Sequence, residues 1–271
     1  MAEPMYRRIA EDLRQKIESG ELGPGAQLPT ELELRDQYDA SRNTVRDAVK
    51  WLTTRRMIES RPGQGTFVIE KIDPFVTTFD LGMDFTDGDD VAYASEVVAH
   101  SRTPTVSSPR IEIHRATGTI VSELQLEEGS AVVSRHLRRY IDGTPWSLQT
   151  TFYPMRYVDA GARRLIEAAL IPYGAVRYIE EKLGIKQVGW RDKLTVRAPD
   201  ADEASFFKLP DDGRVAVFEI YRTAFEYSGT PIRLTITAYP ADRNQFVMNV
   251  GRVPGVDDAN RPVDAEFPAQ P

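Results

Sequence analysis

The amino-acid sequence predicts an α+β protein of two domains: a small helical domain, then a larger domain built on an antiparallel sheet. The first observation is the length of 271 residues, which is typical of two domains. The second is a helical spacing of apolar residues through residues 5–54, followed by a short hairpin pattern. The third is a series of strand-like segments from residue 91 onward with helical segments between them, which indicates an α+β domain.

The first predicted helix has four apolar residues at spacings of three and four, which places them on one face. Gly20 follows this helix and is suited to end it as a C-terminal cap. The helix spans residues 5–19, and its apolar residues are Tyr6, Ile9, Leu13 and Ile17.

Two further helices are predicted from their N-terminal caps. Thr30 and Glu33 have the spacing of a capping box, which opens a helix over residues 31–38. Ser41 is a suitable N-cap for the helix of residues 41–52, "SRNTVRDAVKWL". Each cap gives a backbone N–H group of the first turn a side-chain acceptor.

A β-hairpin is predicted directly after the third helix. Residues 57–70, "MIESRPGQGTFVIE", contain two short strand patterns separated by a Pro-Gly-Gln-Gly turn. Three helices and a two-stranded wing in this order predict a winged helix-turn-helix. In helix-turn-helix proteins the recognition helix lies in the DNA major groove, and its N-terminal residues contact base edges.

The third helix has one apolar and one polar face on a helical wheel. Arginine on such a polar face can bind guanine bidentately. The apolar residues are Val45, Ala48, Val49 and Leu52, and the polar ones are Arg42, Asn43, Arg46, Asp47 and Lys50.

Charge is distributed unevenly along the chain. The net charge of the whole chain is −7, which by itself argues against a nucleic-acid partner. Residues 1–40 contain five Lys/Arg and nine Asp/Glu, a net of −4, whereas residues 41–68 contain six against two, a net of +4. A local basic segment can face phosphates, although on charge alone a solvated surface explains it equally well.

Composition excludes several classes of protein. The sequence has no cysteine, which rules out disulfides and thiolate metal sites and fits a reducing cytoplasm. The three histidines, His100, His114 and His136, lack the spacing of a zinc-enzyme motif. No apolar run reaches the roughly 18 residues that a membrane span needs, and the N-terminus lacks the apolar region of a signal peptide. We therefore expect a cytoplasmic protein without a cofactor.

The rest of the chain is predicted to form a linker, a second domain and a tail. The linker, acidic and without a clear period, has room for one short strand, and the tail contains four prolines and no apolar period. The predicted divisions are residues 1–70 for the winged helix-turn-helix, 71–90 for the linker, 91–250 for the second domain and 251–271 for a flexible tail.

The second domain is predicted to alternate strands with helices. Two Gly turns, at residues 142–145 and 228–231, each join neighbouring antiparallel strands. The predicted strands are residues 91–102, 131–141, 146–154, 189–198, 214–227 and 231–240. The predicted helices are residues 116–126, 162–170, 174–184 and 200–209.

Residues 6–68 resemble the DNA-binding domain of the GntR family over its full length. The resemblance includes the loop "PGAQLPTE", the helix start "SRNTVR" and the wing "GQGTFV". It implies a dimeric transcription factor that binds a palindromic operator. The DNA-binding residues it implies are Arg42, Asn43, Thr44, Arg46 and Lys50 on the helix and Gly63, Gln64 and Gly65 in the wing.

Two positions depart from the family pattern. Many members have arginine, a further DNA contact, where this chain has Leu32. Pro62 also replaces the usual polar residue of the wing. These departures concern which DNA sequence is preferred.

The second domain resembles the UTRA effector-binding domain of the HutC subfamily, which is related in fold to chorismate lyase. The resemblance rests on "LRRYIDGTPWSLQ", "GAVRYIEEKLGI" and "SGTPIRLTITAYPADRNQF". Gly174 stands where members that bind sugar phosphates tend to have serine, so the sequence disfavours a sugar phosphate as the effector. The effector-binding residues implied by position are Arg135, Arg138, Arg139, Gln149, Gly174 and Arg233. Strand alternation places Arg135 and Arg139 on one face and Arg138 on the other.

Three functional hypotheses follow from these patterns. The first is a repressor that a small molecule releases from its operator. The second is a constitutive DNA-binding regulator whose second domain only dimerises. The third is an enzyme related to chorismate lyase, against which the sequence shows no nucleophile–base pair and no metal-ligand pattern, and fold similarity alone does not transfer chemistry.

Overall fold

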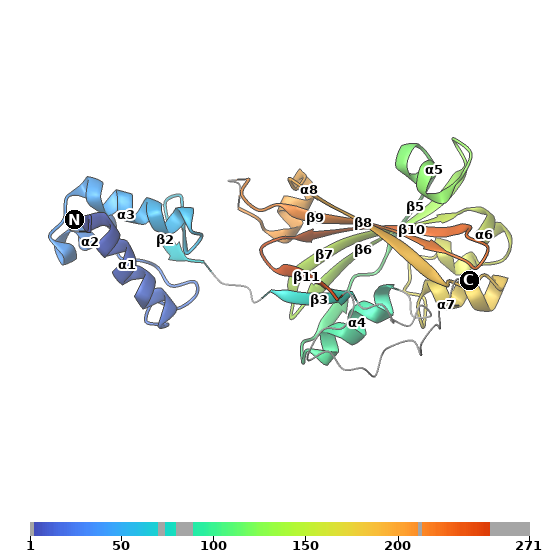
Figure 1. The fold of residues 1–271 in the computed structure, drawn as a ribbon, viewed down its shortest axis with the longest axis horizontal. Helices are drawn as coiled ribbons and strands as arrows, with labels where there is room; N and C mark the ends of the chain where they lie inside the picture. The colour runs from blue at the N-terminus through green and yellow to red at the C-terminus, as the bar shows by residue number, and fades with distance from the viewer. Residues whose placement is uncertain (1–2, 70–73, 80–88, 211–212, 250–271) are drawn as a thin grey trace, which may run out of the picture. The chain divides into compact units, whose positions relative to one another are not determined.

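The structure, a computed structural model, describes residues 3–69, 74–79, 89–210 and 213–249. These residues form two compact units that divide between Asp73 and Pro74 (Figure 1). The predicted tail of residues 251–271 lies outside the described residues, as do most residues of the predicted linker. Within the predicted linker, residues 75–79 belong to a strand and residues 89–90 to a helix of the second unit.

The first unit is a three-helix domain with a two-stranded wing, as predicted. Thr30 and Glu33 form the predicted capping box: the Thr30 N–H donates to Oε2 of Glu33 at 2.7 Å, and the Glu33 N–H donates to Oγ1 of Thr30 at 3.3 Å. The elements are α1 (Met5–Glu18), α2 (Glu31–Tyr38), α3 (Arg42–Thr54), β1 (Ile58–Arg61) and β2 (Gly65–Val68).

The apolar faces of the three helices pack against one another in one core. Ile9 and Leu13 of α1, Leu34 of α2, and Val45 and Leu52 of α3 are each at most 1% exposed. The spacing of three and four along the sequence therefore produces the packing that it predicts. The unit buries its apolar stripe and leaves the polar face of α3 outward.

The second unit is built on a seven-stranded antiparallel sheet. Its main strand order is β4-β6-β7-β10-β9-β8, and β5 also pairs with β6. The strands are β4 (Pro104–Val106), β5 (Arg110–Arg115), β6 (Ala131–Ile141), β7 (Thr144–Pro154), β8 (Gly189–Arg197), β9 (Val217–Phe225) and β10 (Pro231–Pro240). A separate parallel pair consists of β3 (Phe75–Phe79) and β11 (Asn244–Met248).

Both predicted Gly turns join neighbouring strands of this sheet. Asp142 and Gly143 connect β6 to β7 with φ values of +51° and +75°. Positive φ at both central residues is the geometry of a type I′ hairpin turn, which matches the twist of the strands. The second turn, at residues 228–231, connects β9 to β10.

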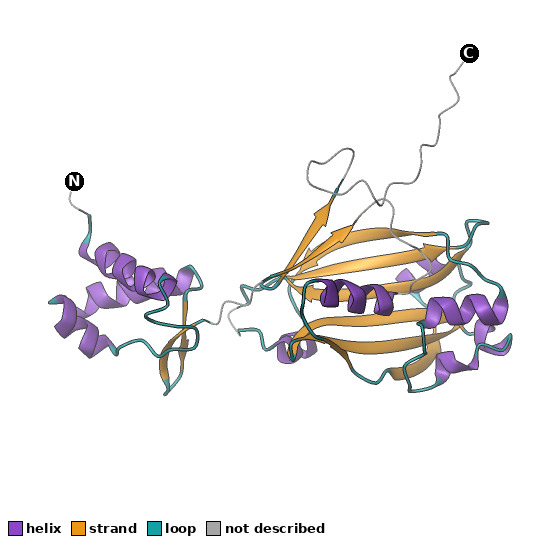
Figure 2. Ribbon diagram, turned by 90° about the horizontal axis from the view of Figure 1, so that it is seen from below, coloured by secondary structure: helices purple, strands orange, loops and turns teal. Residues whose placement is uncertain are grey.

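Helices cover the sheet on both faces. In Figure 1, α5 and α8 lie above the sheet and α4 and α7 below it, and Figure 2 looks onto the lower face. Tyr153 of β7 packs with Tyr178 of α7 on one face, while Phe152 packs with Leu124 of α5 on the other. The helical elements are α4 (Asp89–Ala99), α5 (Gly118–Leu124), α6 (Arg156–Asp159), the 3-10 turn η1 (Arg163–Ile166), α7 (Ala175–Leu183) and α8 (Ala201–Phe207).

The prediction of a strand over residues 91–102 is wrong, because α4 occupies residues 89–99. Tyr93 and Val97 are both buried, at 8% and 0% exposed. Their spacing of four residues puts them on one helical face. A short apolar run of this kind does not distinguish a strand from a helix by its period.

The prediction of a helix over residues 162–170 is also wrong, since the backbone makes only the short turn η1 and becomes extended at Glu167. The guanidinium of Arg135 on β6 lies against this segment. It donates to four carbonyl oxygens, which an α-helix would use for its own backbone bonds. They are those of Arg164 at 3.1 Å, Leu165 at 2.9 Å, Glu167 at 3.0 Å and Ala169 at 2.7 Å.

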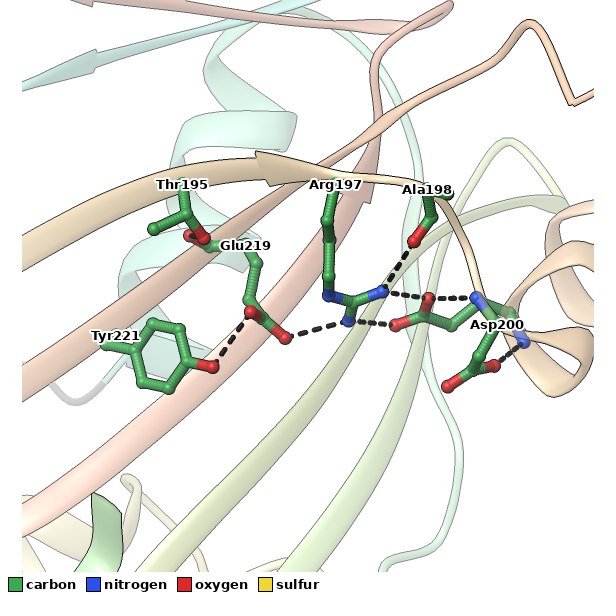
Figure 3. A network of polar contacts seen from close by, with 7 residues as sticks. Thr195, Arg197, Ala198, Asp200, Glu219 and Tyr221 are labelled. Carbon is green, nitrogen blue, oxygen red and sulfur yellow. Dashed lines mark hydrogen bonds and ion pairs between the residues drawn. The ribbon is translucent and has the colours of Figure 1, made fainter. Parts of the chain in front are cut away.

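A charged network fixes α8 to the edge of the sheet (Figure 3). Arg197 of β8 donates to both carboxylate oxygens of Glu203, at 2.6 and 2.7 Å, and to Glu219 at 2.7 Å. Tyr221 donates its hydroxyl to the other oxygen of Glu219 at 2.8 Å. Asp200 and Glu203 also form the capping box of α8. Bidentate pairs of this kind fix geometry as well as adding energy.

A second buried carboxylate, Glu123 of α5, holds its helix against β8 and β9. It accepts from Arg191 at 2.8 Å, from Thr223 at 2.6 Å and from Lys193. Burial raises the pKa of Glu123, but these hydrogen bonds outweigh it and lower the pKa from 4.5 to about 2. The folded state therefore favours the ionised carboxylate.

We expect Glu123→Gln to lower the free energy of unfolding of the second unit by about 2 kcal/mol at pH 7. Because the pKa in the folded protein lies below its unfolded value, this contribution is complete above about pH 4.5 and is lost as the pH falls toward 2. Urea unfolding at several pH values measures it, with the exposed Glu128→Gln as the control. Equal stability of the two variants at pH 7 would contradict the role of Glu123.

Candidate DNA-reading surface and effector pocket

The start of α3 is fixed by Ser41, as predicted. Its hydroxyl accepts from the Thr44 N–H at 3.2 Å and lies 2.8 Å from the Thr44 hydroxyl. The predicted DNA contact Thr44 thus has its side chain engaged in the cap. The cap orients the first turn of α3, from which Arg42 and Asn43 extend into solvent.

The two arginines of α3 are exposed and share a carboxylate. Arg42 and Arg46 have exposed side-chain fractions of 70% and 62%. Nε of Arg42 lies 3.3 Å from Oε2 of Glu31, and Nε of Arg46 lies 3.8 Å from Oε1 of the same residue. Glu31 of α2 therefore restrains both guanidinium groups on one side of the unit. Lys50 is exposed further along α3.

The wing presents its backbone at an exposed turn. Gly63, Gln64 and Gly65 are all exposed, and Gly65 has a φ of +125° that L side chains rarely adopt. A Cβ atom at Gly65 would lie 2.4 Å from Nε2 of Gln27, which donates to the Gln64 carbonyl at 3.0 Å. The bare backbone of Gly65 therefore allows the turn to close against Gln27.

The basic residue Arg55, at the end of α3, is engaged with its own unit. Its guanidinium stacks 3.6 Å from the ring centre of Trp51. Stacking of this kind uses the face of the guanidinium and leaves its edge in water. Trp51 itself packs against the core of the first unit.

A hollow lies on the face of the large sheet that α4 covers, and β3 and β11 border it. It is partly open to solvent, and its enclosed cavity measures about 70 Å³. Its aromatic and aliphatic lining residues are Phe75, Ala92, Tyr93, Trp146, Ile220 and Tyr239. Its polar and charged ones are Thr77, Glu96, Arg139, Gln149, Arg222, Thr235, Thr237 and Asn244.

Three of the six predicted effector residues lie at or beside this hollow. Arg139 and Gln149 line it and are only 2% and 4% exposed. Arg139 lies with its guanidinium 4.7 Å from the ring centre of Tyr93. Arg233 is buried on the same face and donates to the hydroxyl of Thr235, a lining residue, at 2.6 Å.

The other three predicted residues lie elsewhere. Arg135 shares the face of Arg139, but its guanidinium donates to the backbone of residues 164–169. Arg138 is on the opposite face, as strand alternation predicts, where it is exposed beside Phe206. Gly174 is the buried N-cap of α7 and has a φ of +85°. None of the three lines the hollow.

Several lining residues were not predicted from the sequence. Tyr93 and Glu96 belong to α4, which was wrongly predicted as a strand. Arg222 of β9 faces the hollow and is held bidentately by Asp192, at 2.8 and 2.7 Å. Residues two apart on a strand share a face, so Arg222 lies with Ile220 on β9, and Thr235 lies with Thr237 and Tyr239 on β10. This alternation is the signal in the sequence that could have identified these lining residues.

Two kinds of feature are absent from the described residues. None of the described helices is long and apolar enough to cross a membrane. Within the same described ranges, no cluster of three or more His, Cys, Asp or Glu side chains could hold a metal ion.

A winged helix-turn-helix followed in the chain by an α+β domain is an architecture typical of transcription regulators. Residues 5–68 match the model of bacterial regulatory proteins of the gntR family, and residues 99–245 match the UTRA domain model. The chain belongs to the GntR family, in the HutC subfamily that carries a C-terminal UTRA domain. The family consists of DNA-binding transcription regulators, and the chain is not an enzyme.

Known proteins of this architecture are similar over most of the chain. A transcriptional regulator of Streptomyces coelicolor is 27% identical over 250 residues, covering 89% of this chain and 90% of the relative. The Escherichia coli repressor MngR, of the mannosyl-D-glycerate transport/metabolism system, is 32% identical over 152 residues, covering 56% of this chain and 59% of the relative.

Solved structures show the same fold. A GntR-family transcriptional regulator superimposes with a TM-score of 0.62 at 23% identity, covering 93% of this chain and 99% of the other. PhnF from Mycobacterium smegmatis superimposes with a TM-score of 0.54 at 21% identity, covering 90% of this chain and 99% of the other.

Proposed function

We propose that the chain is a homodimeric repressor that binds a palindromic operator in the bacterial cytoplasm and is released by a small molecule. The DNA-reading residues are those of the α3 start and the wing: Arg42, Asn43, Thr44, Arg46, Lys50, Gly63, Gln64 and Gly65. The exposed arginines beside Glu31 support this assignment. The similarity of the chain to MngR, which is a repressor, supports the repressor role.

The observation that carries the release mechanism is the composition of the hollow's wall. Phe75 and Thr77 of β3 line it, and β3 is the first described element after the DNA-binding unit in the sequence. A ligand in the hollow contacts this strand directly. Ligand binding can thus act on β3 and so change the distance between the two DNA-binding domains of a dimer. That distance must match about one turn of DNA for both domains to bind their half-sites.

The lining points to a polar effector. Gln149, Thr235 and Thr237 are at least 95% buried and line the hollow with hydrogen-bonding side chains, which suit a ligand that carries polar groups of its own. Arg139 adds a buried cation suited to a carboxylate or another acceptor. Gly174, at the helix start that holds a phosphate in some members of the family, is not among the lining residues. An acidic compound without a phosphate group is therefore the preferred class.

The experiment has two stages. The full chain first selects duplexes from a random pool, and we expect it to enrich a two-fold symmetric sequence. Mannosyl-D-glycerate, the compound in the name of the MngR system, is then compared with glucose 6-phosphate for thermal stabilisation of the chain and for loss of operator binding. Stabilisation by the acidic sugar with loss of operator binding supports the proposal. If the chain selects a symmetric operator but no polar metabolite stabilises it, the result would instead favour a constitutive regulator.

A further inference from the structure

The indole of Trp146 lines the hollow although strict strand alternation would place it on the other face of the sheet. Arg139 of β6 pairs with Ser147 of β7, so these two side chains share the face of the hollow. The next pair is Tyr140 with Pro145, which leaves Trp146 as one extra residue on β7. A bulge of this kind re-aims a side chain. The bulge therefore brings Trp146 to the same face as Arg139.

Two neighbouring side chains fix the position of the Trp146 ring. The ring of Phe75 on β3 meets it edge-on, with 6.4 Å between the ring centres and an interplanar angle of 88°. The guanidinium of Arg102 lies 4.7 Å from its centre, and Arg102 is itself held by Asp142 at 2.7 Å. Trp146 is 1% exposed. The indole is therefore held in the interior, where its N–H group has no access to bulk water.

The indole N–H group of Trp146 is a buried donor in the wall of the hollow. Its Nε1 atom has no hydrogen-bond partner within the part of the chain that the structure describes. Buried polar groups in native proteins are nearly all paired, because an unpaired one costs free energy. An indole can only donate a hydrogen bond. A ligand in the hollow that presents an acceptor to Trp146 would supply the partner.

The surroundings of Trp146 indicate the chemistry of this acceptor. Arg139, opposite the residue next to Trp146, is 2% exposed and lines the same hollow. A buried guanidinium favours a carboxylate over a neutral carbonyl group, since hydrogen bonds between charged groups are the stronger ones. The enclosed cavity of about 70 Å³ has room for roughly five water-sized groups. It suits a small acidic group, with the rest of a larger ligand in the open mouth.

We propose that Trp146 is an effector-binding residue that donates its indole N–H to the carboxylate of the effector, with Arg139 as the neighbouring cation. The assignment rests on the proposed binding of a small molecule in the hollow and specifies the group by which that molecule is held. It places the carboxylate close to β3, because Phe75 contacts the same indole. Loss of a hydrogen bond to a charged group should weaken binding about tenfold or more.

The first test observes the indole N–H directly in the full chain. The sequence has three tryptophans, so a chain with ¹⁵N-labelled indoles gives three N–H signals in a proton–nitrogen correlation spectrum. Trp51→Phe and Trp190→Phe assign the signal of Trp146 by elimination, without any change at Trp146 itself. Acetate, lactate, pyruvate, D-glycerate and mannosyl-D-glycerate are titrated separately. We expect at least one of them to move the proton signal of Trp146 downfield until it saturates, as a new hydrogen bond requires.

The second test removes the donor and keeps an aromatic ring. Trp146→Phe should bind the carboxylate found in the first test about tenfold more weakly or worse, measured by isothermal titration calorimetry. Trp51→Phe, the matched substitution in the DNA-binding unit, should bind it as the unmodified chain does. The neutral amide of the same compound should bind the unmodified chain at least tenfold more weakly than the carboxylate.

The possible results separate this assignment from the proposed function. If a small molecule releases the operator and no carboxylate moves the Trp146 signal, the role of Trp146 alone is overturned. Equal binding of the carboxylate by Trp146→Phe and the unmodified chain, or equal binding of carboxylate and amide, overturns it as well. If a carboxylate moves the signal and weakens with Trp146→Phe but operator binding is unchanged, the binding site stands and the proposed release fails.

Discussion

Replacing Arg42 and Arg46 together by alanine is expected to reduce operator binding to the level of non-specific DNA. Each arginine that pairs bidentately with a guanine contributes roughly 1–3 kcal/mol of discrimination, and a dimer loses the contribution in both half-sites. Specific binding exceeds non-specific binding by about a thousandfold or more, so the loss is large. Fluorescence anisotropy with operator and scrambled duplexes at one fixed salt concentration measures it.

The matched control removes the same charge from another surface of the same unit. Arg7 and Arg8 are exposed on α1, and their double alanine variant should retain discrimination between the two duplexes. Both double variants should unfold at the temperature of the unmodified chain, because all four side chains are exposed. An Arg42, Arg46 double variant that still prefers the operator would refute the assignment of α3 as the reading helix.

The second large effect is expected at Arg135, where methionine should lower the free energy of unfolding of the second unit by about 2–4 kcal/mol. The four carbonyl bonds of the guanidinium would be lost, and each is worth about 1 kcal/mol in net terms. Because residues 164–169 obtain these bonds from Arg135 and not from a helix, the segment should become protease-sensitive. Urea unfolding and limited proteolysis measure the two consequences.

Arg138→Met is the control for this substitution, because Arg138 lies on the same strand as Arg135 and is exposed on the opposite face of the sheet. Its unfolding free energy should stay within about 0.5 kcal/mol of the unmodified chain. The comparison also distinguishes two roles for Arg135, which are holding the segment of residues 164–169 and contacting the effector. Unchanged stability of the Arg135 variant together with lost ligand binding would show that Arg135 holds the effector and not the loop.

The fold of the first unit could be predicted closely from its sequence. Its helices are short, and each carries a local cap and an apolar stripe that agree with each other. Thr30 and Ser41 accept the backbone hydrogen bonds that their spacing predicts. The same agreement placed Val45 inward and Arg42 outward on α3, so the exposed polar face that we propose as the reading surface could be predicted together with the helix.

The two errors in the second unit have a tertiary cause. The segment of residues 91–102 contains valines and alanines that suit a strand or a helix, and its packing against the sheet decides for α4. The segment of residues 162–170 has a helical composition, but the side chain of Arg135, which lies 29 to 34 residues earlier in the sequence, donates to its carbonyl groups. Local propensity cannot reveal a partner that the fold brings from a distant strand.

The hollow that we propose as the effector site could be predicted only in part for the same reason. Strand alternation correctly put Arg139 and Arg138 on opposite faces, and Gln149 falls on the face of Arg139 because the register pairs β6 with β7. The walls contributed by α4, β3 and β11 depend on how these elements pack. Glu96 and Asn244 line the hollow without a local pattern that indicates it.

The most direct test of the central claim is hydroxyl-radical footprinting of the full chain on its selected operator. If two copies read the DNA through α3 and the wing, the footprint consists of two equivalent protected half-sites, and their centres lie about 10–10.5 base pairs apart or at a multiple of that spacing. The Arg42, Arg46 double variant should leave the same duplex unprotected. A single asymmetric footprint, or protection that survives the double substitution, would contradict the account.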